Sequence, residues 1–331
     1  MVRSIGIDLG TANVLINVKG EGIVVNEPSV VAINTDDHQV VAVGEEAYKM
    51  VGRTPENITA IRPLKDGVIA DFDVTEKMLE YFIKKINTGK MFSKARIMIC
   101  CPTNITAIEQ KAIIEAAQQV GGKDVYLELE PKVAAVGAGM DIFKPQGNMV
   151  IDIGGGTSDI AILSMGDIAT SSSLRLAGDK MSTAIRNYVK DQYNIIIGES
   201  TSEEIKKQIG TVFEPDPNEQ MQIRGRDMQT GLPTAVTISA VDTEVALRDI
   251  MYTIIDRAKK VLEQTAPELS ADIIDHGIML TGGGALVNGV DRLFARELQV
   301  PVIIAEDPLD TVAKGTAILL DQMDVNKQQK R

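Results

Sequence analysis

Two short segments of this chain combine aspartate, glycine and hydroxyl side chains between apolar runs. One spans residues 5–14 and reads IGIDLGTANV, and the other spans residues 150–160 and reads VIDIGGGTSDI. Each pattern predicts a strand, a tight turn and a second strand, and glycine in such a turn lets backbone N–H groups approach phosphate oxygens. Because the pattern occurs twice, we expect a duplicated fold whose halves bind one polyphosphate between them.

Asp8 and Asp152 occupy the same place in the two segments and are candidates for organising Mg²⁺ through bound water. Two carboxylates that face one site repel each other unless a cation lies between them, and Mg²⁺ prefers oxygen ligands. Each aspartate can instead stabilise only its own turn. The repeated pattern favours nucleotide binding, with Thr11, Asn13 and the Gly154–Thr157 run donating to the β- and γ-phosphates.

Two further positions suit chemistry on a bound nucleotide. Gly282, Gly283 and Gly284 follow a predicted strand and precede a helical pattern, and the N–H groups at such a junction suit an α-phosphate or the adenosine. Glu130 stands before Pro131, where a strand gives way to a helix, so its carboxylate could orient or deprotonate a water for attack on a γ-phosphate. An acid that only complements the helix dipole explains Glu130 equally well.

Composition limits the classes of protein to which the chain can belong. Its 331 residues, 44% of them hydrophobic, suffice for two domains with ample cores. The net charge of −12 argues against a nucleic-acid partner, because affinity for nucleic acids depends largely on Lys and Arg. We find no signal peptide and no run of the ~18 apolar residues that a spanning helix needs, so a cytoplasmic protein is expected.

The cysteines and histidines give little support to other chemistries. Cys100 and Cys101 are adjacent, which fits no disulfide framework or metal spacing, and we interpret them as buried strand residues. His38 and His276 are the only histidines and lie far apart in the sequence. A Ser-His-Asp or Cys-His nucleophile therefore has little support.

The elements expected around these residues follow from apolar spacing and turn signals. In the first half these signals predict an inserted polar subdomain over residues 35–73, a helix from Thr75, a strand over 97–101, a helix over 105–119, a strand over 125–129 and a helix from Glu130-Pro131. In the second half they predict helices over 184–193 and 243–265, a helix capped by Ser200 or Thr201 that ends at Ile209, a β-hairpin over 222–239, a strand over 277–280 and a disordered tail over 325–331.

Together these residues resemble the actin, Hsp70 and sugar-kinase ATPase superfamily, and within it the bacterial actin MreB family and its Mbl branch. The resemblance covers residues 3 to about 320. It is carried by IGIDLGTANVLI at 5–16, NEPSVVA at 26–32, RPLKDGVIADF at 62–72, CCPTNIT at 100–106, EPKVAA at 130–135, IDIGGGTSDIA at 151–161, IRGRDMQTGLP at 223–233 and LTGGGALVNG at 280–289.

The resemblance implies an α/β actin-like ATPase fold, in which each of two duplicated domains carries an inserted smaller subdomain and ATP with Mg²⁺ lies in the cleft. The expected boundaries are 1–33 plus 74–140 for subdomain IA, 34–73 for IB, 141–180 plus 241–320 for IIA and 181–240 for IIB. The implied nucleotide contacts are Asp8, Gly10, Thr11, Ala12, Asn13, Asp152, Gly154, Gly155, Gly156, Thr157, Glu203, Lys206, Gly282, Gly283, Gly284 and Ala285.

Glu130 corresponds to the family glutamate that activates the hydrolytic water. The family usually has an acidic residue directly before this glutamate, whereas here Leu129 stands there. Any effect of this departure is expected on hydrolysis and not on ATP binding. Hydrolysis is expected to be slow, dependent on Mg²⁺ and coupled to polymerisation, so that the main role is structural.

The resemblance also implies a filament at the inner face of the cell membrane that organises sidewall peptidoglycan synthesis and maintains rod shape. The implied partners are further copies of the chain in paired protofilaments, sibling MreB-type filaments, membrane lipid and the membrane-embedded cell-wall elongation machinery. The longer amphipathic leader of some relatives is missing, so attachment is expected through Met91 and Phe92, between Lys90 and Lys94. The alternative is that Phe92 folds back onto the core.

Three other functions fit the same fold. A chaperone ATPase would need further length for a peptide-binding domain, and a small-molecule kinase would need a base placed for a substrate hydroxyl. A third alternative is an adaptor that binds ATP and membrane without hydrolysis. Concentration-dependent assembly, or turnover stimulated by a sugar, would discriminate between these readings.

Overall fold

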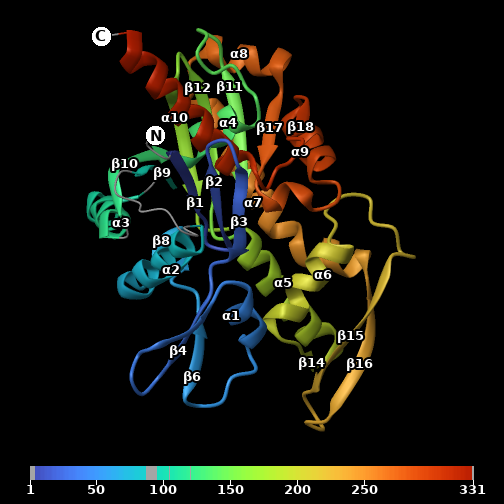
Figure 1. Ribbon diagram of the computed structural model, residues 1–331. Coiled ribbons are helices and arrows are strands. Elements are labelled where there is room, and N and C mark those ends of the chain that lie inside the picture. The colour runs from blue at the N-terminus through green and yellow to red at the C-terminus, as the bar shows by residue number, and fades with distance from the viewer. Residues whose placement is uncertain (1–3, 87–94, 104, 120, 330–331) are drawn as a thin grey trace.

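Two five-stranded sheets form the two halves of the molecule (Figure 1). The computed structural model describes residues 4–86, 95–103, 105–119 and 121–329, of which 324–329 are described by their backbone alone. From edge to edge, the first sheet contains β10 (Gly122–Leu129), β9 (Ala95–Cys101), β1 (Ser4–Leu9), β2 (Asn13–Val18) and β3 (Gly22–Pro28). The second contains β18 (Val302–Ile304), β17 (Ile278–Thr281), β11 (Asn148–Ile153), β12 (Ser158–Ser164) and β13 (Asp167–Leu174).

The two sheets follow one plan, which confirms the predicted duplication. In the first, β1 is antiparallel to β2 and parallel to β9. In the second, β11 is antiparallel to β12 and parallel to β17. Asp8 lies near the end of β1 and Asp152 near the end of β11, so the repeated segments place equivalent carboxylates at equivalent turns. The predicted strand at Cys100 and Cys101 is also confirmed, and both side chains are buried.

Each half carries a smaller inserted sheet. In the first half, β4 (Val31–Asn34), β5 (Val40–Val43) and β6 (Ile58–Ile61) pair beside α1 (Glu45–Met50), and β7 (Leu64–Lys65) and β8 (Val68–Ile69) form a short ribbon. In the second half, β14 (Ile195–Ile196), β15 (Gln220–Asp227) and β16 (Pro233–Ser239) pair near α5 (Gly178–Tyr193) and α6 (Glu199–Ile209). The β15–β16 pair is the predicted hairpin.

Helix boundaries differ in part from those expected. α6 begins after Gly198 and no side chain caps it, so the predicted capping by Ser200 or Thr201 is wrong. α2 (Phe72–Lys85) begins before Thr75, because the Asp71 carboxylate accepts a hydrogen bond from the Val74 N–H group at 3.0 Å. The long helix α7 (Ala240–Gln264) begins at a capping box made by Ser239 and Asp242.

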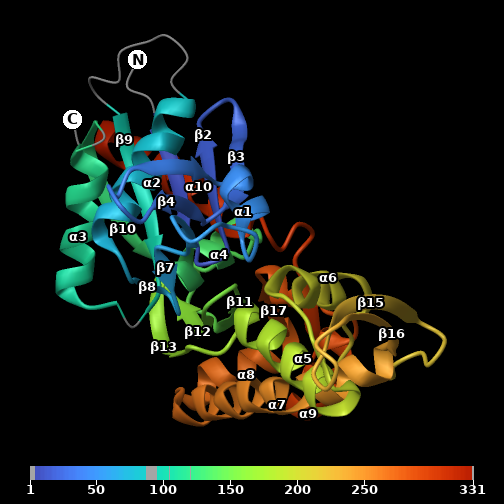
Figure 2. The ribbon, with the colours of Figure 1, turned by 90° about the horizontal axis from the view of Figure 1, so that it is seen from below.

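Helices cover both faces of each sheet. α7, α8 (Pro267–His276) and α9 (Val290–Leu298) cover the outer face of the second sheet (Figure 2). α3 (Ala107–Gln119) packs on β10 and on α2 in the first half. None of the helices within the described ranges combines the length and the apolar character needed to cross a membrane.

Two helices lie between the sheets and join the halves. α4 (Glu130–Gly137) contacts β11 and β12, and α10 (Thr311–Gln329) packs on α4, β1 and β2. The two helices approach closely, because a Cβ atom on Gly137 would lie 1.8 Å from the Thr311 carbonyl oxygen and one on Gly315 would lie 2.0 Å from that of Val133. Buried apolar side chains of α4, α10, β9, β11 and β12 form one hydrophobic cluster that joins the two halves.

The position of α10 corrects two expectations. Residues 311–320 were expected in subdomain IIA, but α10 packs against the first sheet, where a Cβ atom on Gly6 would lie 1.8 Å from the Thr316 hydroxyl oxygen. Residues 325–329 were expected to be disordered, but α10 continues to Gln329. The polar composition of this tail suggested disorder, yet helix formation begun by the packed residues 311–320 extends through it.

Candidate nucleotide-binding cleft

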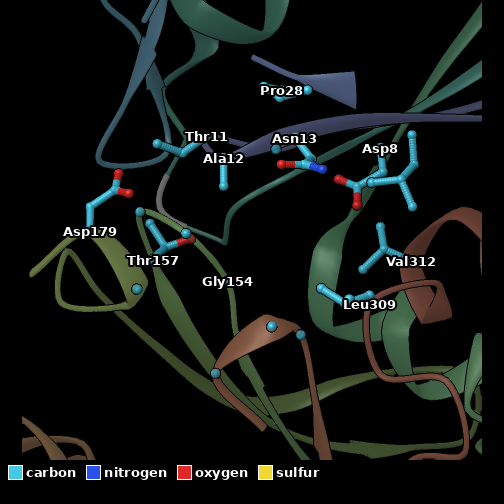
Figure 3. A pocket seen from close by; sticks show the side chains of 18 of the residues that line it. Asp8, Thr11, Ala12, Asn13, Pro28, Gly154, Thr157, Asp179, Leu309 and Val312 are labelled. Atoms are coloured by element: carbon cyan, nitrogen blue, oxygen red, sulfur yellow. The ribbon is translucent and has the colours of Figure 1, made fainter. Parts of the chain in front are cut away.

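A cavity of about 630 Å³ opens between the two halves. Of the predicted nucleotide contacts, all but Ala285 line it, and so does Glu130. Ala285 is fully buried beneath the cavity wall. Figure 3 shows Thr11 and Ala12 on one side of the cavity facing Thr157 on the other, with Asp179 beside them. The sequence therefore predicted 16 of the 34 lining residues, and these 16 come from both halves.

The turns of the two strand pairs touch each other at the floor of the cavity. A Cβ atom on Gly155 would lie 2.5 Å from the Ala12 Cβ, and one on Gly156 would lie 2.5 Å from the Thr11 hydroxyl oxygen. Neither glycine has a positive φ, so close approach, and not backbone conformation, requires glycine at these positions. The contact brings the backbone N–H groups of both turns to one place, as polyphosphate binding requires.

The third glycine cluster lies against the second turn. Gly282 has a φ of 78°, and a Cβ atom there would lie 2.5 Å from the Asp152 carboxylate. A Cβ atom on Gly284 would lie 2.2 Å from the Ile153 side chain. Gly283 begins a short 3-10 helix (Gly283–Leu286) whose first residues line the cavity. The N-terminal N–H groups of this element are therefore available to a ligand.

Asp8 and Asp152 face the cavity from opposite halves. Burial raises the pKa of both carboxyl groups, and with the charge of Asp152 beside Asp8 and of Asp159 beside Asp152 each pKa reaches about 7. The Thr281 hydroxyl donates to Asp152 Oδ1 at 3.0 Å, which opposes the shift. A cation between the two carboxylates would relieve both burial and repulsion, so these residues fit Mg²⁺ held through water and phosphate oxygens. Within the described part of the chain no cluster of three metal ligands is found.

Glu130 is the first residue of α4 and lies at the end of β10. Burial raises its pKa well above the ordinary value, and the charges of Asp159, Asp8 and Asp152 raise it further. A nearby cation would oppose this rise in pKa, and the Asp8–Asp152 pair could supply that cation's site. The geometry thus keeps Glu130 as a candidate for water activation.

Glu203 and Lys206 lie on one face of α6 and pair with each other at 2.6 Å. The Ser182 hydroxyl donates to Glu203 at 2.8 Å, and the Lys206 ammonium donates to the Gly178 carbonyl oxygen at 3.0 Å. Burial would raise the pKa of Glu203, but the Lys206 charge lowers it below its ordinary value. These contacts fix a charged pair at the cavity wall, suited to the hydroxyl groups of a ribose.

Several lining residues were not predicted. Arg62 reaches across the cavity mouth and donates through Nε and Nη2 to Glu199 at 3.1 and 2.7 Å. The Gly67 N–H donates to the Thr11 hydroxyl at 3.2 Å, and a Cβ atom on Gly67 would lie 2.5 Å from Thr157. Both residues fall in the motif at 62–72, so the sequence marked this segment, but it predicted no role for either residue. Leu309 and Val312, near Asp8 in Figure 3, had no sequence signal.

The predicted membrane residues Met91 and Phe92 lie outside the described residues. Their role stays a prediction.

The fold and this cleft define an actin-like nucleotide-binding protein. Residues 2–328 match the sequence profile of the family described as MreB/Mbl protein. The chain belongs to this family. It is 63% identical over 322 residues to the cell shape-determining protein Mbl of Bacillus subtilis, covering 97% of each chain, and 46% identical to MreB of Escherichia coli, covering 98% of this chain and 95% of that one. The higher identity to Mbl supports the Mbl branch.

Solved structures of related proteins have the same fold as this chain. MreB5 of Spiroplasma citri bound to AMPPNP superposes with a TM-score of 0.95 at 40% identity, covering 100% of this chain and 99% of that chain. The MamK double helical filament superposes with a TM-score of 0.81 at 21% identity, covering 97% of this chain and 99% of that chain, and so shows the fold alone. The predicted actin-like fold is confirmed.

Proposed function

We propose that this protein is a cytoskeletal ATPase that binds ATP with Mg²⁺ in the cleft and assembles into filaments that maintain rod shape. The observation that carries the proposal is the contact of the two glycine turns around the facing carboxylates of Asp8 and Asp152. Support comes from the relatives named for cell shape determination and from the related Spiroplasma citri structures bound to AMPPNP and ADP.

In the bound state, residues 10–13 and 154–157 hold the β- and γ-phosphates, and residues 282–284 lie toward the α-phosphate. Glu203 and Lys206 hold the ribose, and the exposed Leu286 lines the same cavity. Mg²⁺, when bound, neutralises phosphate charge and the charge of the two aspartates. ATP is preferred over GTP by family resemblance.

Hydrolysis uses Glu130. Its carboxylate accepts a proton from a water whose oxygen attacks the γ-phosphorus, and the bond from that phosphorus to the bridging oxygen of ADP breaks. ADP and inorganic phosphate leave. Because Glu130 and the phosphate-binding Thr157 belong to different halves, closure of the cleft on assembly would position the attacking water between them, and free subunits would hydrolyse slowly.

Assembly requires complementary surfaces at opposite ends of the second half. Met228 and Leu232 are exposed at the tip of the β15–β16 hairpin. Met165 is exposed in the turn after β12, and the exposed Phe143, from the segment between α4 and β11, packs beside this turn against Gly166. The turn lies at the end occupied by α8, where the Gly147 N–H donates to Asp272, and the hairpin lies at the opposite end (Figure 1). A head-to-tail contact between unlike patches does not close on itself and therefore gives an open filament.

The proposed membrane role is supported by the resemblance of the chain to the MreB family. We propose that the filament lies at the inner face of the cell membrane, held by Met91 and Phe92, where many weak insertions add up along a polymer. Its proposed partners there are lipid, sibling MreB-type filaments and the wall elongation machinery, whose sidewall peptidoglycan synthesis the filament organises.

Sedimentation of the purified chain over a concentration series, with Mg²⁺ and ATP and with phosphate release followed in parallel, tests this function. We expect a critical concentration, faster turnover above it and additional pellet with anionic vesicles. Turnover that rises linearly with protein and no pellet at any concentration would favour a kinase or chaperone ATPase. The Glu130→Ala variant should assemble but lose about 10²-fold or more in turnover; unchanged turnover would remove Glu130 from the mechanism.

A further inference from the structure

Asp159 is a buried carboxylate that the proposed function does not yet use. It lies on β12, is 1% exposed, and faces Asp152 directly across the β11–β12 pair. Directly opposed residues of an antiparallel pair project to the same face of the sheet. Asp159 therefore stands on the face that carries the candidate cation-binding carboxylate, one strand farther from β17.

The partner of Asp159 comes from the other half of the molecule. The Thr103 backbone N–H and hydroxyl both donate to Asp159 Oδ1, at 3.3 and 3.1 Å. Thr103 follows β9, whose last residue Cys101 pairs with Leu129 of β10. Thr103 and Glu130 thus leave the same edge of the first sheet from adjacent strands, so Asp159 is bonded to the strand end beside Glu130.

Electrostatics places Asp159 close to both ends of the proposed reaction. After burial, its charge is the largest cause that raises the pKa of Glu130. Burial also raises the pKa of Asp159 itself, and the hydrogen bonds from Thr103 oppose that shift. One carboxylate, two residues after Thr157 of the phosphate-binding turn, therefore interacts with the opposite half and with the water-activating glutamate.

We propose that Asp159 is a positioning residue, which through Thr103 fixes the strand end that carries Glu130 against the turn that carries Thr157. This inference rests on the proposed hydrolysis. An attacking water must lie about 3 Å from both a γ-phosphate and its base. Because those two groups belong to different halves, the Thr103–Asp159 bonds set the distance between them.

The test compares Thr103→Val, which removes one of the two donors, with Thr103→Ser, which retains it. In single-turnover assays of the full chain with Mg²⁺ and ATP, we expect Thr103→Val to slow γ-phosphate cleavage about tenfold, as the loss of a buried hydrogen bond to a charged group allows. Affinity for AMPPNP should change less than about twofold, and Thr103→Ser should stay within about twofold of wild type in both. Asp159→Asn, which retains an oxygen acceptor, should be slowed less than Asp159→Ala.

Two controls separate positioning from general damage. Thr243→Val removes another buried hydroxyl, which donates to the Ile209 carbonyl oxygen at 2.9 Å far along the chain from Glu130; it should lower stability without slowing cleavage. In the Glu130→Ala background Thr103→Val should add nothing, since both act on one step. Additive losses, or a fall in AMPPNP affinity as large as the fall in rate, would overturn the inference.

A readout that needs no hydrolysis completes the test. Amide hydrogen exchange of the AMPPNP complex should be faster over residues 126–134 in Thr103→Val than in Thr103→Ser. Equal exchange would overturn the inference even if cleavage slowed. If wild type cleaved no ATP at all, the proposed hydrolysis would be wrong, while this exchange difference would still decide whether Thr103 holds the strand end.

Discussion

The floor and the mouth of the cleft join the same two halves through different kinds of contact. At the floor, Thr103 bonds to the buried Asp159, and the two glycine turns touch. At the mouth, Arg62 pairs with Glu199, whose side chains are 24% and 40% exposed. Hydrogen bonds to a buried charged group are strong, whereas a partly exposed ion pair is weaker and is screened by salt. The floor therefore sets geometry, and the mouth can open without disturbing it.

The largest effect is expected from a change that separates the two turns at the floor. In Gly156→Ala the new methyl group would lie 2.5 Å from the Thr11 hydroxyl oxygen, so the turns must move apart. A displacement approaching 1 Å at a reacting centre lowers turnover by about 10²-fold, which phosphate release would measure. Gly198→Ala, where nothing lies within 4 Å, is the matched control and should behave as wild type. Normal turnover in Gly156→Ala would mean that the turns need not touch.

A second prediction concerns pH and the floor carboxylates. Asp152 has a pKa of about 7 in the fold against an ordinary value of 3.8, so the folded, nucleotide-free protein holds a proton that the unfolded chain loses. Stability from this group is present below about pH 4 and is lost as pH rises through about 7. Asp152→Asn should be nearest to wild type below about pH 4, and its stability should exceed that of wild type by a margin that grows between pH 5 and pH 8, by on the order of 1 kcal/mol or more.

Urea unfolding at several pH values without Mg²⁺ or nucleotide measures this difference. Asp249→Asn, on the exposed side of α7, controls for introducing an amide. A difference between Asp152→Asn and wild type that does not grow between pH 5 and pH 8 would contradict the prediction.

At the mouth, charge reversal should act on nucleotide exchange. Arg62→Glu and Glu199→Arg should each speed dissociation of a fluorescent ADP about two- to fivefold, as expected for a partly exposed pair. The double variant should recover much of the wild-type rate, and salt should reduce every difference. The same charge reversals at Arg248 and Glu244, an ion pair within α7, are the control and should leave ADP dissociation unchanged. No recovery in the double variant would show that these residues act separately.

The smallest effect is expected for the second mouth pair. Lys180 and Asp66 are 4.0 Å apart, with side chains 46% and 26% exposed. Such a pair contributes little, so Lys180→Ala should change ADP dissociation less than about twofold, in the same assay. A larger change than that of Arg62→Glu would reverse the ranking of the two pairs.

The same contrast separates what the sequence predicted from what it did not. Both glycine turns, the strand before Glu130 and the β15–β16 hairpin depend on residues that are neighbours in the chain, so their patterns were visible. The Thr103–Asp159 bonds and the Arg62–Glu199 pair join residues from different halves, and no local spacing encodes them. The prediction of a capped α6 was wrong for a related reason. Ile205 and Ile209 pack in the hydrophobic core of the second half, and this packing fixes the helix without a side-chain cap.

The path of the chain through α10 has a consequence for synthesis on the ribosome. This helix closes over β1 and β2, yet it is translated after every strand of the second sheet. While the polypeptide is still emerging, the first half exposes the apolar surface that α10 later covers. Such surface promotes aggregation in partly made chains. The N-terminal half is therefore expected to need chaperone binding until α10 has been translated.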